Sequence, residues 1–308
     1  MSLLETISRW RGKRPPVFEK KPSSALVRDW TFAPTQASLG VRAVRIESLF
    51  LGLRFKPPAR ELKSVHAARA WTCYFVYAPD GELSESHRFT LKRLRQLERP
   101  LLVVCAAPTA ATVPRDLLQL CDALWWKGLR GFDFSAYRIG LYAVAGKSPG
   151  ADVFVLNDSV LGPFCDLDPI LRGAKWDLTG FTGFALIENH IQSYAFQLRH
   201  VTHQRLAILE SVLPTSLAFN DYQSVIYLQE TRFARTAARH MSVGALWYSD
   251  AVACGDPTVF AGPDLLINGF PFLKRSLFGR NRHLYDQSFL QRLLQDRGHQ
   301  MPVAARTA

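Results

Sequence analysis

Short apolar runs alternate with helical patterns from residue 70 onward. The runs Trp71–Tyr77, Leu101–Ala106 and Asp152–Leu156 are nearly continuous in their apolar character, which is typical of strands with both faces covered. Between the first two, Ser84–Leu97 repeats leucine with helical spacing. Strands that alternate with helices indicate βαβ units with right-handed crossovers. The pattern therefore predicts an α/β fold with a mostly parallel central sheet.

The remaining elements follow from the same periodicities. We predict helices over Pro114–Leu120 and Ser135–Val144, a strand over Ala123–Trp126, polar helices near His190–His200 and Tyr222–His240, and a strand over Ala245–Tyr248. Residues 61–308 contain no internal repeat and are expected to form one domain.

The first 60 residues are expected to form a separate N-terminal arm. Leu3, Leu4, Ile7 and Trp10 share one face of a short helix, beside several basic residues, before Pro15-Pro16 ends it. Such an arm suits a membrane interface, with Trp10 at the level of the headgroups. The alternative is an arm that packs on its own domain or has no fixed structure.

The charge balance favours an anionic partner. Lys and Arg number 38 against 26 Asp and Glu, a net charge of +12. No module typical of nucleic-acid binding occurs, so we expect no nucleic-acid partner. The positive surplus indicates either an ordinary solvated surface or an attraction for phosphorylated substrates or anionic lipid. The five cysteines form no CxxC pair, and no apolar run is long enough to cross a bilayer. These features predict a cytoplasmic protein.

Several familiar catalytic motifs are absent from the sequence. It contains no GxGxxG after the first strand, no GxxxxGK[ST], no GxSxG and no HExxH. In open α/β sheets, ligands bind beyond the carboxyl ends of the strands. The informative segments are therefore Ala78–Gly81, Ala106–Thr109, Lys127–Phe134 and Asn157–Pro163.

Four places in these segments and beyond carry candidate chemistry. Asn157-Asp158-Ser159 follows a strand and offers oxygen ligands for a hard cation, although such residues also form turns. Arg130 and Asp133 suit a phosphate and a sugar hydroxyl, or Asp133 caps a helix. His190, Gln192 and Tyr194 lie close together in sequence. Glu230 follows an apolar segment and suits a general base, or interacts with the dipole of its helix.

Taken in order, these places resemble the rhamnan synthesis protein F family of bacterial glycosyltransferases. The matching strings are YFVYAPDGELS, KGLRGFDFSAYRIGL, VFVLNDSVLGPF, KWDLTGFT, NHIQSYAFQLR, the helix of Glu230 and NGFPFLKRSLF, which together cover about residues 70–280. The first 60 residues carry no part of this resemblance.

The resemblance implies a Rossmann-like fold of the GT-A type, with a nucleotide-sugar site and an adjoining acceptor site. In such enzymes an acidic triplet after a central strand binds a metal–diphosphate, and a glutamate at the start of a later helix deprotonates the acceptor. Here the residues at the triplet are Asn157-Asp158-Ser159, and those at the start of the later helix are Glu230-Thr231, so each place has one carboxylate. A bound Mg²⁺ or Mn²⁺ would rest on Asp158 alone, and Arg130 or Lys274 would assist the leaving diphosphate.

The resemblance also implies a set of site residues. They are Tyr77, Asp80, Arg130, Asp133, Asn157, Asp158 and Ser159 for the donor; His190, Gln192, Tyr194 and Lys274 for the acceptor; and the carboxylates Glu230, as the base, and Asp177, which would hold a sugar hydroxyl.

Two functions from different classes remain open at this point. The first is an inverting glycosyltransferase that moves a deoxysugar, L-rhamnose from dTDP-L-rhamnose, to a lipid-linked glycan of a cell-surface polysaccharide such as an O-antigen. It would work in the cytoplasm at the inner face of the membrane. The second is a non-catalytic component that binds a sugar or nucleotide within an assembly complex, which the missing second carboxylate favours.

Overall fold

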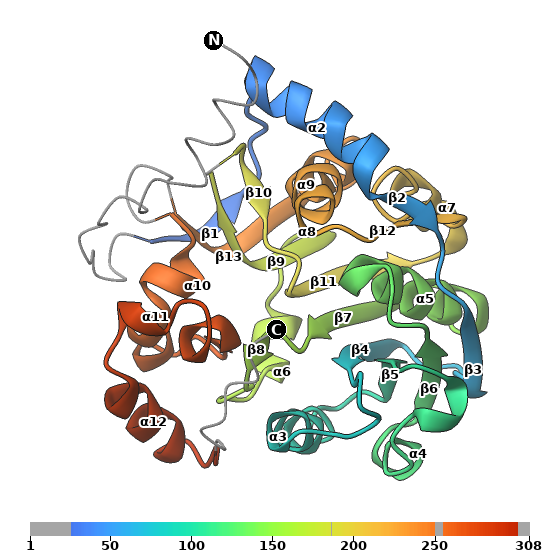
Figure 1. Ribbon diagram of the computed structural model, residues 1–308, viewed down its shortest axis with the longest axis vertical. Coiled ribbons are helices and arrows are strands. Elements are labelled where there is room, and N and C mark those ends of the chain that lie inside the picture. Colours follow the sequence, from blue (N-terminus) through green and yellow to red (C-terminus); the bar gives the residue numbers. More distant parts are fainter. Residues whose placement is uncertain (1–25, 186, 250–254, 301–308) are drawn as a thin grey trace.

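A computed structural model describes residues 26–185, 187–249 and 255–300. Ten strands of this part of the chain form one large sheet, with helices packed against it (Figure 1). The strands are β1 (Val27–Thr31), β3 (Ala59–Lys63), β4 (Ala70–Tyr77), β5 (Leu101–Ala106), β6 (Ala123–Lys127), β7 (Ala151–Asn157), β9 (Leu178–Phe184), β10 (His190–Ile191), β11 (Ala195–Val201) and β13 (Val243–Ser249).

The other elements cover the sheet or form small additions to it. β2 (Leu53–Phe55) pairs with β12 (Leu217–Phe219), and β8 (Val160–Leu161) pairs with β14 (Leu273–Lys274). The longer helices are α2 (Leu39–Gly52), α3 (Glu85–Leu94), α5 (Phe132–Lys147), α9 (Thr231–Ala237) and α12 (Gln287–Gln295). Shorter helical segments are η2 (Ala110–Thr112), α4 (Leu117–Leu120), α6 (Asp168–Arg172), α7 (His203–Ile208), α8 (Tyr222–Ser224), η3 (Val225–Glu230), α10 (Pro257–Phe260), α11 (Gly262–Ile267), η4 (Arg275–Phe278) and η5 (Arg282–Leu284).

The strand order shows a mostly parallel sheet. The order is β1-β13-β9-β11-β7-β4-β5-β6-β3, and β10 pairs with β9. β7, β4, β5 and β6 are parallel neighbours, as are β9 and β13, while β11 runs antiparallel to both β7 and β9. Six of these ten strands therefore share one direction. The predicted α/β fold with a mostly parallel central sheet is confirmed.

Side chains of the central strands alternate between two cores. On β4, Trp71, Cys73 and Phe75 point into one apolar cluster, and Tyr74 and Val76 point into the other. This is why the run Trp71–Tyr77 is apolar at nearly every position: the sheet is covered on both faces. A third, smaller cluster joins the C-terminal helices, which lie together at the left of Figure 1.

The helix predicted near His190–His200 is wrong. This segment forms β10 and β11, and β11 lies in the middle of the sheet between β7 and β9. Its polar residues suggested a solvated helix, but Gln192 and Gln197 are buried, and Gln192 is hydrogen-bonded inside the protein. The strands predicted around residues 71–77, 101–106, 123–126, 152–156 and 245–248 are confirmed, as are helices within residues 84–97, 114–120, 135–144 and 222–240.

The predicted boundary at residue 60 does not match the structure. β1 pairs with β13 at one edge of the sheet, and β3 pairs with β6 at the other edge. Residues 27–63 thus supply both outer strands and belong to the domain. The predicted amphipathic segment around Trp10 lies outside the described residues. Among the described residues, no helix has the length and apolar character needed to span a bilayer.

Candidate active site

The carboxyl ends of the parallel strands meet along one edge of the sheet. β4 ends at Tyr77, β6 at Lys127, β7 at Asn157 and β9 at Phe184. Because these strands are parallel, the residues that follow them lie at the same edge. This edge therefore collects most of the candidate residues.

Asp158 lies directly after β7 and joins it to the end of β4. Its Oδ2 accepts hydrogen bonds from the Tyr77 backbone N–H at 2.9 Å and from His87 Nε2 at 3.1 Å. Burial alone would raise the pKa of Asp158, but the hydrogen bond from His87, the charge of Arg275 and the Tyr77 N–H together lower it below its usual value. Asp158 is therefore ionised at neutral pH.

His87 is fixed in one orientation by the start of α3. Ser84 caps this helix, and the Ser84 backbone N–H donates to His87 Nδ1 at 3.2 Å. Since Nδ1 accepts a hydrogen bond, we assign the ring proton to Nε2, which points at Asp158. His87 thus acts as a donor to Asp158 and holds it in place.

The donor set around Asp158 does not fit a resident divalent cation. Its oxygen Oδ2 takes two hydrogen bonds, and the neighbouring His87 presents a proton rather than a lone pair. Within the described ranges, no three His, Cys, Asp or Glu side chains come together as metal ligands. We therefore derive no step of the chemistry through a metal held by these residues.

Asn157 and Asp133 form a second polar network. Asn157 Nδ2 donates to Asp133 Oδ2 and to the Tyr137 hydroxyl, both at 2.9 Å, and Tyr137 donates to Asp133 at 3.0 Å. Asn157 Oδ1 accepts from Ser159 Oγ at 2.6 Å. Burial, followed by the charge of Glu230, raises the pKa of Asp133, and these hydrogen bonds oppose the rise. The network fixes the triplet Asn157-Asp158-Ser159 against the start of α5.

The loop before α5 has an unusual backbone and a buried lysine beneath it. Gly131 and Phe132 both have positive φ, 89° and 47°, and a Cβ at Gly131 would lie 2.8 Å from Ser135 Oγ. Lys127 is completely buried, and its Nζ donates to the Arg130 carbonyl at 2.9 Å. Burial lowers the pKa of Lys127 to about 7. Strained backbone over a buried lysine is typical of a functional loop.

Glu230 ends a π-helical segment and faces the hairpin that follows β9. η3 is π-helical, and such insertions occur frequently at functional sites. Glu230 Oε2 accepts from the Ser193 N–H at 3.1 Å and from Ser193 Oγ at 2.5 Å. Ser193 therefore orients this carboxylate, and the charge of Glu230 acts on Asp133 of the network above.

His190 lies near the same carboxylate. Burial lowers the pKa of His190, and the charges of Glu230 and Asp256 oppose this. Its Nδ1 lies 2.7 Å from the Glu188 carbonyl, so Nδ1 carries a proton and Nε2 is a free acceptor in the neutral ring. His190 thus presents an unprotonated ring nitrogen near Glu230.

The other predicted acceptor residues lie deeper. Gln192 and Tyr194 are buried, and both bind the Thr182 hydroxyl, at 2.6 and 2.8 Å. Lys274 Nζ lies 4.6 Å from the centre of the Tyr194 ring. Lys274 and Tyr194 thus form one cation–π pair at the base of the site.

Arg275, which follows Lys274 in sequence, is the arginine whose charge lowers the pKa of Asp158. The Arg275 backbone N–H donates to the Ser159 carbonyl at 2.9 Å, and its guanidinium acts on the pKa of Asp158. Arg275 Nε and Nη2 are buried without a hydrogen-bond partner. A guanidinium with unused donors beside the triplet is suited to bind an anion.

Four predicted residues lie at the margin of the site or elsewhere. Tyr77 and Asp80 are exposed in the loop after β4, where Asp80 accepts from the Glu82 N–H at 3.2 Å, and Arg130 is exposed beside Lys127. Asp177, by contrast, precedes β9 and lies at the opposite edge of the sheet.

The expected role of Asp177 does not agree with this position. Its oxygens accept from Arg205 at 3.0 Å and from Ser242 at 2.8 and 2.9 Å. These contacts fix the start of β9 and β13. Asp177 was expected beside the donor because it follows the triplet closely in sequence. It lies before the start of β9, however, and only the end of β9 reaches the edge of the sheet where the triplet lies.

Four residues of this edge of the sheet were not predicted from the sequence: His87, Tyr137, Lys127 and Arg275. Tyr137 lies four residues after Asp133 on the same helix, a spacing that brings side chains together and was a usable signal. His87 reaches Asp158 over 71 residues of sequence, and no local pattern indicates that contact. Lys127 stood in an apolar strand as its last residue, where its burial could not be inferred.

Comparisons with known proteins agree with this architecture. The model of a family described as RgpF, rhamnan synthesis protein F, matches residues 101–300. A search of curated proteins found no match to the chain.

Two solved structures are similar at low sequence identity. The inositol-1-phosphate CTP transferase from T. maritima is 8% identical with a TM-score of 0.38, covering 66% of this chain and 97% of that one. A putative nucleotide-diphospho-sugar transferase from Desulfovibrio desulfuricans G20 is 11% identical with a TM-score of 0.37, covering 74% and 95%. At this level of similarity, neither structure informs the chemistry of the site.

Proposed function

The chain belongs to the rhamnan synthesis protein F family, and from this premise we propose that it is an inverting glycosyltransferase. Its donor would be a nucleotide-activated deoxysugar, dTDP-L-rhamnose, and its acceptor a lipid-linked glycan at the inner face of the cell membrane. The observation that carries the proposal is the approach of three carboxylates, Asp133, Asp158 and Glu230, to one edge of the sheet.

Glu230 is the proposed general base. A sugar hydroxyl is a poor nucleophile, so a positioned carboxylate must accept its proton as the new bond forms. Ser193 holds one oxygen of Glu230 through two hydrogen bonds and leaves Oε1 to face the acceptor. The acceptor oxygen then attacks the anomeric carbon, and the electron pair of the broken bond leaves with the diphosphate. Attack from the opposite face inverts the anomeric configuration.

The leaving diphosphate gains negative charge, which the chain's own cations would stabilise. Arg275 offers unused donors beside Ser159, and Lys274 precedes it at the end of β14. Asp158 is ionised and positions the loop of Tyr77 and the ring of His87, rather than binding the phosphates itself. The network of Asn157, Asp133 and Tyr137 would bind the nucleoside or sugar hydroxyls.

The decisive experiment is turnover of a nucleotide sugar. Purified full-length protein is incubated with dTDP-L-rhamnose and a lipid-linked glycan extract, and release of dTDP is followed by chromatography. UDP-glucose is the matched control donor, and parallel reactions contain Mg²⁺, Mn²⁺ or EDTA. We expect transfer from dTDP-L-rhamnose that EDTA does not abolish. If calorimetry shows that a nucleotide sugar binds but no nucleotide sugar is turned over, the proposal that the protein is a glycosyltransferase is contradicted.

The second candidate function is a non-catalytic binding component. It is favoured by one observation, the engagement of Asp158 by His87 and the Tyr77 N–H in place of a metal set. Binding of the donor with no turnover over the whole range of acceptors supports this alternative.

A further inference from the structure

The outer face of α2 exposes an unusual concentration of apolar side chains. Thirteen large apolar side chains are exposed in the described part of the chain, and six of them lie within residues 39–55. Leu39, Ile46 and Phe50 are spaced seven and four residues apart and share one face of the helix, with exposed fractions of 81%, 62% and 78%. A continuous apolar face of this kind marks an interaction site.

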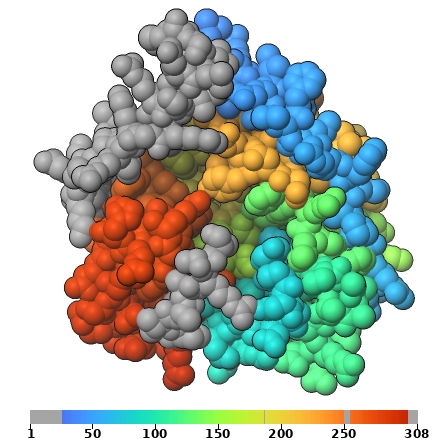
Figure 2. Space-filling view, in the orientation of Figure 1, coloured from blue at the N-terminus to red at the C-terminus, as the bar shows by residue number. Residues whose placement is uncertain are grey.

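We call this face the α2 surface. It consists of the exposed residues Leu39, Arg42, Ile46, Glu47, Leu49, Phe50, Leu51, Arg54, Phe55 and Lys56. Figure 2 shows the segment that contains it, in blue, along the rim of the molecule.

The charges of the α2 surface are mostly positive. Arg42, Arg54 and Lys56 are exposed around the apolar side chains, and Glu47 is the acidic residue among them. The whole chain carries a net charge of +12. Apolar side chains flanked by arginine and lysine are typical of a helix that lies in the interface of an anionic bilayer.

The inner face of α2 is bound firmly to the acceptor side of the site. Arg45 Nε donates to the Tyr227 carbonyl at 2.9 Å, and Arg45 Nη2 donates to Thr231 Oγ1 at 3.1 Å. Ser224 Oγ donates to the Ser48 carbonyl at 2.9 Å. These contacts attach α2 to the segments on either side of Glu230.

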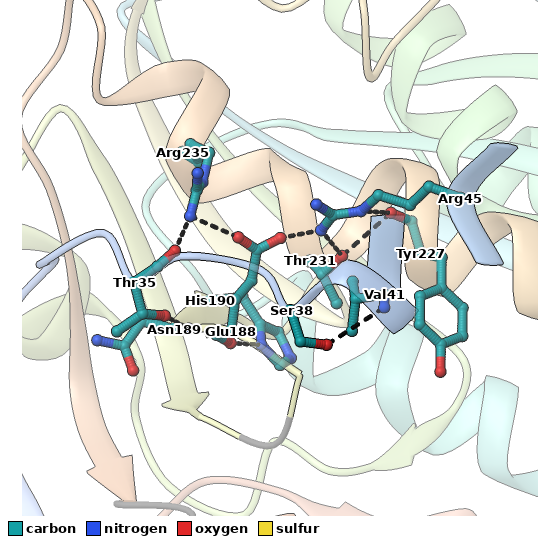
Figure 3. Close-up of polar contacts among 10 residues, drawn as sticks. All are labelled: Thr35, Ser38, Val41, Arg45, Glu188, Asn189, His190, Tyr227, Thr231 and Arg235. Atoms are coloured by element: carbon teal, nitrogen blue, oxygen red, sulfur yellow. Dashed lines mark hydrogen bonds and ion pairs between the residues drawn. The ribbon is translucent and has the colours of Figure 1, made fainter. Parts of the chain in front are cut away.

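A buried ion cluster strengthens this attachment. The Glu188 carboxylate has no exposed surface and pairs with Arg45 of α2 and, at 2.6 Å, with Arg235 of α9 (Figure 3). Arg235 also donates to the Thr35 carbonyl just before α2. Removing either partner of a buried pair is costly, so α2 and α9 move as one body.

We propose that the α2 surface docks on an anionic lipid bilayer. Leu39, Ile46 and Phe50 insert at the boundary between headgroups and acyl chains, and Arg42, Arg54 and Lys56 lie against the headgroups. Because α2 is fixed to α9, docking holds Glu230 at a set distance and orientation from the lipid surface. The use of this orientation, to meet a lipid-linked acceptor, rests on the proposed function, whereas the docking itself does not.

The test is sedimentation of the full chain with vesicles. One set contains equal parts of phosphatidylcholine and phosphatidylglycerol, and the other contains phosphatidylcholine alone. We expect binding to the anionic vesicles, weaker binding at high salt because charges are screened, and little binding to the neutral ones. Equal binding to both sets contradicts the electrostatic part of the proposal.

Two matched variants test the apolar part. Leu39→Ser, Ile46→Ser and Phe50→Ser in one chain should weaken binding to anionic vesicles by about tenfold or more, since each loses buried apolar area in the bilayer. The control carries Leu118→Ser, Ile267→Ser and Phe289→Ser, which are exposed on α4, α11 and α12, and should bind as the unmodified chain does. Both variants should keep the thermal midpoint, because all six side chains are exposed.

Three results would overturn the proposal. The first is unchanged binding by the α2 variant. The second is loss of binding in a chain with Leu3→Ser, Ile7→Ser and Trp10→Ser but not in the α2 variant. The third is a dimer in light scattering that the α2 variant dissociates, since a second copy would then cover the face. Nucleotide-sugar turnover is measured separately, so its absence with intact vesicle binding contradicts the proposed function alone.

Discussion

Replacement of the proposed base, Glu230→Gln, is the sharpest test of the chemistry. Glutamine keeps the shape of the side chain and removes its ability to accept a proton. We expect transfer to fall by about 10² to 10⁴, the range that general base catalysis contributes, while the donor still binds. In free energy, this is about 3 to 5 kcal/mol of lost transition-state stabilisation.

The structural cost of the same change is smaller. Glu230 Oε2 accepts from the N–H and Oγ of Ser193, and a glutamine carbonyl oxygen can accept the same two hydrogen bonds. Exchanging a charged for a neutral acceptor weakens each of them, which costs about 1 kcal/mol in total stability. A domain of ordinary stability remains folded after such a loss.

Glu210 offers a matched control elsewhere in the chain. Its Oε1 accepts from the N–H and Oγ1 of Thr215, at 2.8 and 2.9 Å, which reproduces the arrangement of Glu230 and Ser193. It follows α7, beyond the end of β11 that lies opposite the site. Glu210→Gln should therefore change stability by a similar amount and leave transfer intact.

The assay is single-turnover transfer, with donor affinity measured by calorimetry and stability by thermal unfolding. If Glu230→Gln transfers sugar at the normal rate, Glu230 is not the base, and His190 becomes the next group to test. If both glutamine variants lose transfer equally, the effect is structural and the assignment fails.

Three further predictions follow from the same contacts. Asp158→Ala should leave the fold intact and reduce donor binding and transfer below detection, whereas Asp158→Asn keeps acceptors for Tyr77 and His87 and should retain part of the activity. Asp133→Ala should weaken nucleotide binding in calorimetry, and a nucleotide-bound structure should place the nucleotide against Asp133 and the loop of residues 77–81. Lys127 has a pKa lowered by burial to about 7, below its value of about 10.5 in the unfolded chain, so the unfolded state binds more protons between these values and stability should rise with pH across this window. Lys127→Met should flatten that rise and raise the thermal midpoint at neutral pH.

Each of these has a contradicting result. Normal turnover by Asp158→Ala removes Asp158 from the site, and a nucleotide bound far from Asp133 removes the proposed donor network. A pH profile of stability that Lys127→Met leaves unchanged would show that Lys127 is not responsible for it.

The central strands could be predicted because burial on both faces leaves a strong signal. Trp71–Tyr77 and Leu101–Ala106 are apolar at almost every position, and only a covered strand needs this. The segment at residues 190–201 could not be predicted in the same way. Its polar residues Gln192 and Gln197 are buried, Gln192 between β10 and β11 and Gln197 within β11, and Thr182, the partner of Gln192, comes from β9. The meaning of a buried polar residue depends on a partner that the local sequence does not reveal.

The edge of the sheet that holds the candidate site could be predicted from the sequence, but the contacts between its side chains could not. The rule that ligands collect at strand ends selected Tyr77, Asp133 and Asn157 correctly as neighbours, because it depends only on strand direction. It did not select Asp177, which was expected near the donor because it follows the triplet closely in sequence, and it could not find His87, whose contact with Asp158 depends on how α3 packs. Burial of Lys127 likewise depends on the whole fold.

The environments of the three site carboxylates separate their roles. The hydrogen bond from His87 and the charge of Arg275 keep Asp158 ionised, so it is suited to hold hydrogen-bond donors and not to exchange protons. Burial and the charge of Glu230 raise the pKa of Asp133, so a proton is retained more easily on Asp133 than on a solvated carboxylate. Glu230 lies outside both of these networks, with one oxygen held by Ser193, so its position fits the proposed base better than that of Asp133 or Asp158 does.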